Sequence, residues 1–151
     1  MMSRFVSLIC FVLAVVLTGI LIGYMTLPGE WYATLNKPSF TPPNWVFAPA
    51  WTALYFTIAI AGWRCWVHDR NSMAMKFWSV QLALNFLWSP IFFGAQQPGT
   101  ALVIVIAAFA AVLSFIAAAW NTDRLSAVLF MPYAAWTAFA IALNAGVVIM
   151  N

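Results

Sequence analysis

Residues 100–120 read TALVIVIAAFAAVLSFIAAAW and carry no charged side chain over 21 consecutive positions. At a rise of about 1.5 Å per residue, a helix of about 20 residues crosses the hydrocarbon core of a bilayer, which is about 30 Å thick. In water, such a helix would expose apolar side chains on every face. The segment is therefore predicted to be a transmembrane helix, and it sets the class of the whole chain.

Four more apolar runs of similar length lie elsewhere in the sequence. The five predicted spans cover residues 5–27, 46–67, 75–95, 100–120 and 125–150. The connections at 96–99 and 121–124 are short, so the helices that they join must run antiparallel. The sequence predicts an all-α integral membrane protein with one domain, residues 1–151. Its five transmembrane helices form a bundle, and a structured loop at 28–45 joins the first two.

The composition supports this class and excludes others. Hydrophobic residues make up 66% of the chain and charged residues only 6%, whereas charged residues make up about a quarter of ordinary soluble domains. The six basic residues form no cluster. Nucleic-acid binding requires clustered Lys and Arg, so membrane lipid is the expected partner and nucleic acid is not. No metal site is expected, because Cys10 and Cys65 lack metal-ligand spacing.

The basic residues predict how the chain is oriented in the membrane. In the five-span arrangement, one side of the membrane holds Lys37 alone. The other side holds five basic residues: Arg4, Arg64, Arg70, Lys76 and Arg124. Basic residues favour the cytoplasmic side, so the N-terminus is predicted to be cytoplasmic, with loop 28–45 and the C-terminus outside. The all-helical pattern favours the inner membrane of a bacterium, because spanning proteins of the outer membrane are typically barrels.

No conventional catalytic site is evident in the sequence. The single histidine, His68, is predicted to lie in an exposed loop beside Asp69 and Arg70. No charged residue lies deep inside a span, which argues against a proton-coupled pump, since such residues usually mark the ion route.

Aromatic rings lie along one face of each of three predicted helices, and amides share this face in two of them. At helical spacing the faces consist of Ala48, Trp51, Tyr55 and Gly62; Gln81, Asn85, Trp88 and Phe92; and Tyr133, Trp136, Ala140 and Asn144. Amides at membrane depth face the bundle interior. Two structures fit this pattern, a ligand cavity and a tightly packed polar core. Pro90 and Pro132 favour the cavity, because a proline inside a helix bends it and frees a carbonyl group.

The loop before the second span is stiffened by prolines. Its sequence, WYATLNKPSFTPPNWVFAPAWTALY at residues 31–55, leads directly into the polar and aromatic face of that span. Trp31, Tyr32 and Trp45 are predicted to form a rigid cap over the mouth of an outer-half cavity. A stiff lid loses less entropy when a ligand binds. The alternative is an interfacial loop that carries an aromatic belt.

Three stretches of the chain resemble the signature regions of a known family. WYATLNKPSFTPPNWVFAPAWTALY, QLALNFLWSPIFFG and PYAAWTAFAIALN are similar to motifs of the TspO/MBR family, which comprises bacterial tryptophan-rich sensory proteins and the mitochondrial translocator protein. The resemblance implies a membrane receptor, commonly a homodimer, that needs no cofactor and binds protoporphyrin IX or haem. The implied ligand-binding residues are Trp31, Tyr32, Trp51, Tyr55, Asn85, Trp88, Trp136, Ala140 and Asn144. Ala48 completes the predicted set, because it lies on the same face of the second span as Trp51 and Tyr55.

Two departures from the family pattern bear on the ligand. Phe40 stands where the family often has tryptophan, which removes one indole from the loop. The stretch LNAGVVIMN in the fifth span lacks the cholesterol-recognition consensus of mammalian members, and only a weak form of it occurs at Leu27, Tyr32 and Lys37. Cholesterol is therefore not expected to be the physiological ligand.

Three functions remain open from the sequence. The leading hypothesis is a sensor that binds a tetrapyrrole in the cavity and regulates or moves it. A light-dependent porphyrin-degrading enzyme is the alternative, as in some family members, with Trp51 and Trp136 as the candidate catalytic residues. A tetrapyrrole or lipid transporter is the third. Small residues at Gly19 and Gly23, and at 110, 114 and 118, predict close helix packing within the bundle or in a homodimer.

Overall fold

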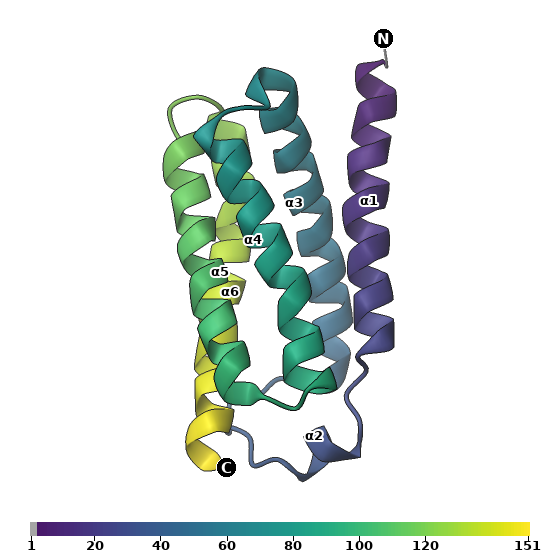
Figure 1. Ribbon diagram of the computed structural model, residues 1–151, viewed down its shortest axis with the longest axis vertical. Coiled ribbons are helices and arrows are strands. Elements are labelled where there is room, and N and C mark those ends of the chain that lie inside the picture. Colours follow the sequence, from purple (N-terminus) through teal and green to yellow (C-terminus); the bar gives the residue numbers. More distant parts are fainter. Residues whose placement is uncertain (1–2) are drawn as a thin grey trace.

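The computed structural model describes residues 3–151, and within this range it contains helices and no strand (Figure 1). In chain order the elements are α1 (Arg4–Met25), α2 (Glu30–Thr34), the 3-10 turn η1 (Asn44–Val46), α3 (Phe47–Asp69), α4 (Met73–Ser89), the π-helical turn η2 (Pro90–Gly94), α5 (Pro98–Ala119) and α6 (Arg124–Met150). The five long helices form the bundle that the sequence predicts, so the predicted fold class is confirmed.

When η2 is counted together with α4, the ends of the long helical segments lie within two residues of the ends of the five predicted spans. Four helical segments, α1, η1 with α3, α5 and α6, have the length and hydropathy needed to cross a membrane. Helix α4 has only 17 residues, but η2 continues it to Gly94. At about 1.5 Å per residue, the combined segment also approaches the thickness of the hydrocarbon core.

The prediction that His68 lies in a loop is wrong. His68 and Asp69 form the last turn of α3, and His68 is exposed. The helix continues this far because no glycine or proline interrupts residues 63–69. The next helix, α4, begins at Met73 and is capped by Ser72, whose hydroxyl accepts a hydrogen bond from the Met75 amide at 3.2 Å.

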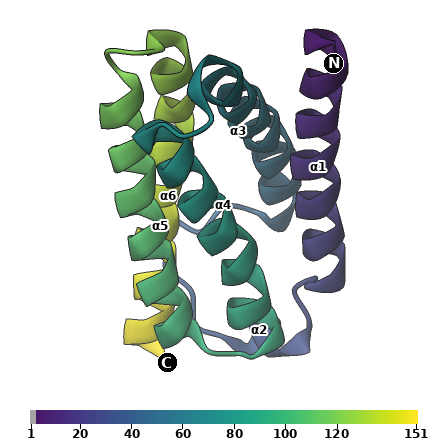
Figure 2. The ribbon, with the colours of Figure 1, turned by 45° about the horizontal axis from the view of Figure 1, so that its top comes forward.

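The helices pack around the bundle in an order that differs from their order in the chain. α1 packs against α3, α3 against α6, α6 against α5 and α5 against α4. The contacts of α4 with α1 and α3 are much less extensive. Figures 1 and 2 show α2 and its flanking loop crossing the same end of the bundle as the C-terminus, opposite the N-terminus. We call this the lid end.

The half of the bundle away from the lid end is closely packed. Gly62 lies against the Trp78 indole with no space for a Cβ atom. The same indole donates a hydrogen bond from Nε1 to the Ile58 carbonyl at 2.8 Å. The rings of Phe115 and Phe130 are 3.9 Å apart between centroids. This half therefore leaves little room for a ligand.

An ion pair joins α3 to α6 at the closely packed end. Arg64 Nε and Nη2 donate to the two carboxylate oxygens of Asp123 at 2.9 and 2.7 Å. Ser126 Oγ donates to the same carboxylate at 2.6 Å. Burial opposes ionisation of Asp123, but the hydrogen bonds from Arg64 and Ser126 outweigh it and lower the pKa of this carboxyl group.

Candidate ligand-binding cavity

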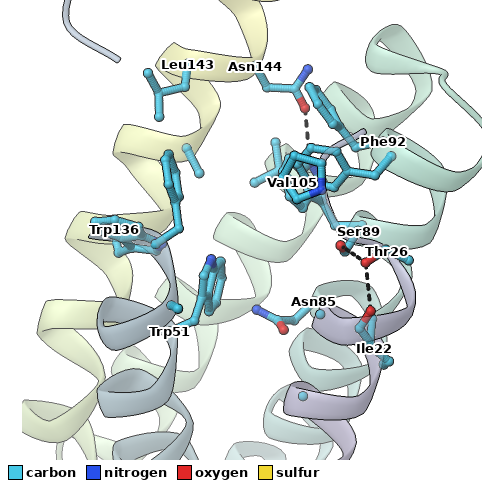
Figure 3. A pocket seen from close by; sticks show the side chains of 18 of the residues that line it. Ile22, Thr26, Trp51, Asn85, Ser89, Phe92, Val105, Trp136, Leu143 and Asn144 are labelled. Carbon is cyan, nitrogen blue, oxygen red and sulfur yellow. Dashed lines mark hydrogen bonds between the residues drawn. The ribbon is translucent and has the colours of Figure 1, made fainter. Parts of the chain in front are cut away.

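A cavity of about 800 Å³ occupies the half of the bundle next to the lid end (Figure 3). Its walls come mainly from α1, α3, α4 and α6, and loop residues Tyr32, Lys37 and Thr41 border it. Small-molecule sites typically measure about 300–1,000 Å³. Of the two structures that fit the amide and aromatic pattern, the protein therefore has the cavity rather than a fully packed polar core.

Aromatic rings form two walls of the cavity. The indole of Trp51 stacks on the Tyr55 ring, with centroids 5.5 Å apart and planes inclined at 28°. Trp136 meets Trp51 edge to face at 6.3 Å and 86°, and Figure 3 shows the two indoles side by side across from Asn85. On the other wall, Trp88 stacks on Phe92 at 5.0 Å and 23°. These rings offer apolar surface on both sides of the space.

Asn85 joins the rings of two other helices. Its Nδ2 donates to the Tyr133 hydroxyl at 2.9 Å, and its Oδ1 accepts from the Tyr55 hydroxyl at 3.3 Å. Tyr133 is fully buried. Because α3, α4 and α6 each contribute one of these groups, the amide fixes the position of the tyrosine rings at the base of the cavity.

Asn144 also joins groups from two other segments of the bundle, at a position nearer the lid end. Its Oδ1 accepts from Trp88 Nε1 at 3.0 Å, and its Nδ2 donates to the Pro98 carbonyl at 2.8 Å. The residue is only 2% exposed. One amide therefore links α4, the start of α5 and α6, and holds the Trp88 indole against the cavity.

Nine of the ten predicted ligand-binding residues line the cavity. They are Tyr32, Ala48, Trp51, Tyr55, Asn85, Trp88, Trp136, Ala140 and Asn144. The tenth, Trp31, lies outside the lining and packs edge to face on Phe92 at 5.8 Å, so it supports the wall from behind.

The prediction that Trp45 caps the cavity is wrong. Trp45 is 75% exposed and lies in the short η1 turn, outside the cavity lining. Its position fits the interfacial aromatic belt that was the alternative for this loop, since an amphipathic indole is favoured at a membrane interface. The loop is thus divided, with Tyr32, Lys37 and Thr41 facing the cavity and Trp45 facing away.

Gln81 lies on the same face of α4 as Asn85 and Trp88 but does not line the cavity. It is completely buried but lies outside the cavity lining. Its Nε2 donates to the Trp78 carbonyl at 2.9 Å, while its Oε1 has no hydrogen-bond partner among residues 3–151. The polar face of α4 therefore reaches beyond the cavity into the packed half of the bundle.

Helix α1 contributes a wall that the sequence did not predict. Gly19 and Gly23 line the cavity from this helix, and Thr26 lines it from the C-cap position directly after the helix. The Thr26 and Ser89 hydroxyls are hydrogen bonded at 2.6 Å across to α4, as Figure 3 shows. Helix α1 is apolar on all faces, so its two glycines were the only signal for this wall, and we interpreted them as packing sites.

Two of the contacts that fasten the loop to the bundle involve Asn36 and Tyr32. At one, Asn36 and Asn151 exchange hydrogen bonds of 3.0 Å (Asn36 N to Asn151 Oδ1) and 2.9 Å (Asn151 Nδ2 to Asn36 O). At the other, the Tyr32 ring packs edge to face on Phe93 at 5.3 Å. Burial raises the pKa of the Tyr32 phenol. These contacts hold residues 32–37 over the cavity.

The fold and the cavity define an all-helical integral membrane protein with an aromatic, loop-covered cavity in one half of its bundle. The chain belongs to the TspO/MBR family, whose model matches residues 10–150. Its relatives include the tryptophan-rich sensory protein of Cereibacter sphaeroides, 41% identical over 81% of this chain and 77% of that protein. The tryptophan-rich protein TspO of Archaeoglobus fulgidus is 40% identical over 96% and 97%. The human translocator protein is 37% identical over 83% and 79%.

Proposed function

We propose that the protein binds a planar tetrapyrrole, protoporphyrin IX or haem, in this cavity and acts as a membrane sensor that regulates or moves it. The observation that carries the proposal is a space of about 800 Å³ walled by indole and phenol rings. Rings of this kind stack on a flat aromatic macrocycle. The size and mostly apolar lining are those of a small-molecule site.

The hydrogen bonds within the cavity suggest where the affinity comes from. Asn85 and Asn144 already bond to neighbouring protein groups through both their oxygen and their nitrogen. These bonds hold Tyr55, Tyr133 and Trp88 in place, so the two amides serve mainly to order the cavity walls. A preordered site of this kind loses little conformational entropy on binding, so contact with the rings supplies most of the affinity.

The test is a binding titration with a matched pair of variants. Protoporphyrin IX should quench the tryptophan fluorescence of the purified protein saturably, with one molecule bound per chain. Ala140→Phe places a phenyl ring in the cavity, whereas Ala138→Phe places it on the exposed face of the same helix. We expect Ala140→Phe to weaken binding at least about tenfold, a loss of about 1.4 kcal/mol, and Ala138→Phe to bind as the wild type does. Equal affinities for the two variants would show that the porphyrin binds elsewhere.

One geometric feature favours a second candidate function, light-dependent porphyrin degradation. Trp51 and Trp136 both line the cavity and lie 6.3 Å apart between ring centroids. A porphyrin bound in the cavity would lie against both indoles, which are then placed to exchange an electron with its light-excited state. Illumination under air would then convert the bound porphyrin to a new absorbing product, and Trp51→Phe with Trp136→Phe would abolish this conversion while binding persists. A spectrum that changes no faster than a protein-free control would exclude the enzyme.

A further inference from the structure

Lys37 is the only charged residue among those that line the cavity in the described part of the chain. The other lining residues are aliphatic, aromatic, or neutral polar residues such as Thr26, Ser89 and Asn144. Lys37 lies in the loop at the lid end and is half-buried. In such an apolar space one charge acts with little screening, so it weighs heavily on which ligand fits.

The ammonium group of Lys37 is held by neutral groups. Nζ donates to the Tyr32 carbonyl at 2.7 Å and to the Leu35 carbonyl at 3.0 Å. It also lies 4.6 Å from the centroid of the Tyr32 ring. An ammonium group has three donors, so one hydrogen remains after the two carbonyls are bonded.

No carboxylate among residues 3–151 forms an ion pair with Lys37. The single ion pair found within residues 3–151 is Arg64–Asp123, which lies at the opposite end of the bundle. Glu30 is the only acidic residue at the lid end, and it makes no ion pair with Lys37. A half-buried cation at the edge of a cavity, with one free donor and no anionic partner, is suited to an anionic group on a ligand.

We propose that Lys37 binds a carboxylate of the ligand at the lid end, so that the cavity selects an apolar ring system carrying an acidic group over a neutral one of the same shape. This inference rests on the proposed function and specifies that the ligand carries an acidic group. Protoporphyrin IX carries both of its propionates on one edge and only apolar groups on the opposite edge. The propionate edge then lies at Lys37, and the apolar edge points toward Trp51 and Trp136.

The same contact joins ligand recognition to the lid. Lys37 directly follows Asn36, which is bonded to Asn151 at the end of α6, and its Nζ donates to the carbonyl of Tyr32, whose ring packs on Phe93 of η2. A carboxylate that binds Nζ adds an anchor next to these two attachments. The acidic ligand therefore holds the loop closed more firmly than a neutral ligand does.

The experiment compares protoporphyrin IX with its dimethyl ester, which has the same ring and no carboxylate. Both are titrated into the protein in phosphatidylcholine nanodiscs, with tryptophan quenching as the readout. We expect the wild type to bind the diacid about tenfold more tightly than the ester, a difference of about 1.4 kcal/mol. Lys37→Gln should reduce this ratio to about one by weakening only the diacid, and Lys37→Arg should keep it. Lys76→Gln removes the same charge from an exposed site at the opposite end and should leave the ratio unchanged.

Each contrary result has a separate meaning. Equal binding of diacid and ester by the wild type would overturn the role of Lys37 and leave tetrapyrrole binding intact. A Lys37→Gln variant that loses both ligands to the same extent would show that Lys37 only orders the loop, which also overturns the inference. Binding of neither ligand by the wild type would instead refute the proposed function. Oleate is a carboxylate without a ring, and equal competition by oleate would refute selection of a ring.

Discussion

Replacing Asn144 with alanine tests whether a single amide fastens three helices around the cavity. The wild-type side chain accepts from Trp88 Nε1 at 3.0 Å and donates to the Pro98 carbonyl at 2.8 Å. Asn144→Ala removes both bonds at a position that is 2% exposed. The indole N–H then has no acceptor inside a bundle from which water is largely excluded, and such a group is costly to leave unpaired.

The magnitude follows from the two bonds. Interhelical hydrogen bonds in membrane proteins contribute about 0.6 kcal/mol on average and up to about 1.7 kcal/mol. Losing both predicts a decrease of about 1–3 kcal/mol in the free energy of unfolding. The truncated side chain borders an existing cavity, so little further loss is expected from the space that it vacates.

Equilibrium unfolding in mixed micelles, with increasing sodium dodecyl sulfate, measures this free energy. Asn121→Ala is the matched control, because Asn121 is exposed in the turn between α5 and α6. It should change the free energy by no more than about 0.5 kcal/mol. The tryptophan fluorescence of the folded protein, to which Trp88 contributes, should change in Asn144→Ala and stay unchanged in Asn121→Ala. If the two variants unfold at the same denaturant concentration, the amide does not join the helices as described.

Two further predictions concern other helix contacts. The lowered native pKa of Asp123 means that its ion pair with Arg64 contributes stability above the ordinary pKa of 3.8, and that this stability is lost as the pH falls through the native pKa. Thermal unfolding should show that the wild type loses stability between about pH 5 and pH 2 more steeply than Asp123→Asn does, and parallel curves would contradict this. Gly19→Ala should destabilise the protein by about 1–3 kcal/mol, because its Cβ would overlap the Tyr55 ring, whereas Gly23→Ala meets nothing within 4 Å and should be nearly neutral. Equal unfolding free energies for the two alanine variants would show that α1 does not pack on α3 as closely as the structure has it.

Most of the cavity residues were predictable because, on their helices, polar or aromatic side chains occupy one face and aliphatic side chains the others. On α4 and α6, amides and large rings recur at helical spacing within otherwise apolar sequence, and on α3 large rings do so. Such polar groups are unfavourable in lipid, so their direction is determined before any packing is known. Asn85 and Asn144 lie in the cavity wall for this reason. Gln81 shows the limit of the argument, since it is buried as expected but lies in the packed half.

Residues in segments without a distinct polar or aromatic face were not predictable. Every face of α1 is apolar, so periodicity could not indicate that Thr26 faces Ser89. In the loop, Trp45 and Tyr32 are both aromatic residues of the same proline-stiffened segment, yet one faces away from the cavity and the other borders it. Their directions depend on how the loop is fastened to α4 and α6.

Membrane insertion is determined locally, because the transfer free energy of each span sums over about 20 neighbouring residues. The order of residues was therefore enough to predict five helices, their ends and their polar faces. The volume of the cavity, the wall made by α1 and the position of Lys37 at its edge arise when distant segments pack together. These features depend on contacts between helices, which the residues of any one helix do not specify.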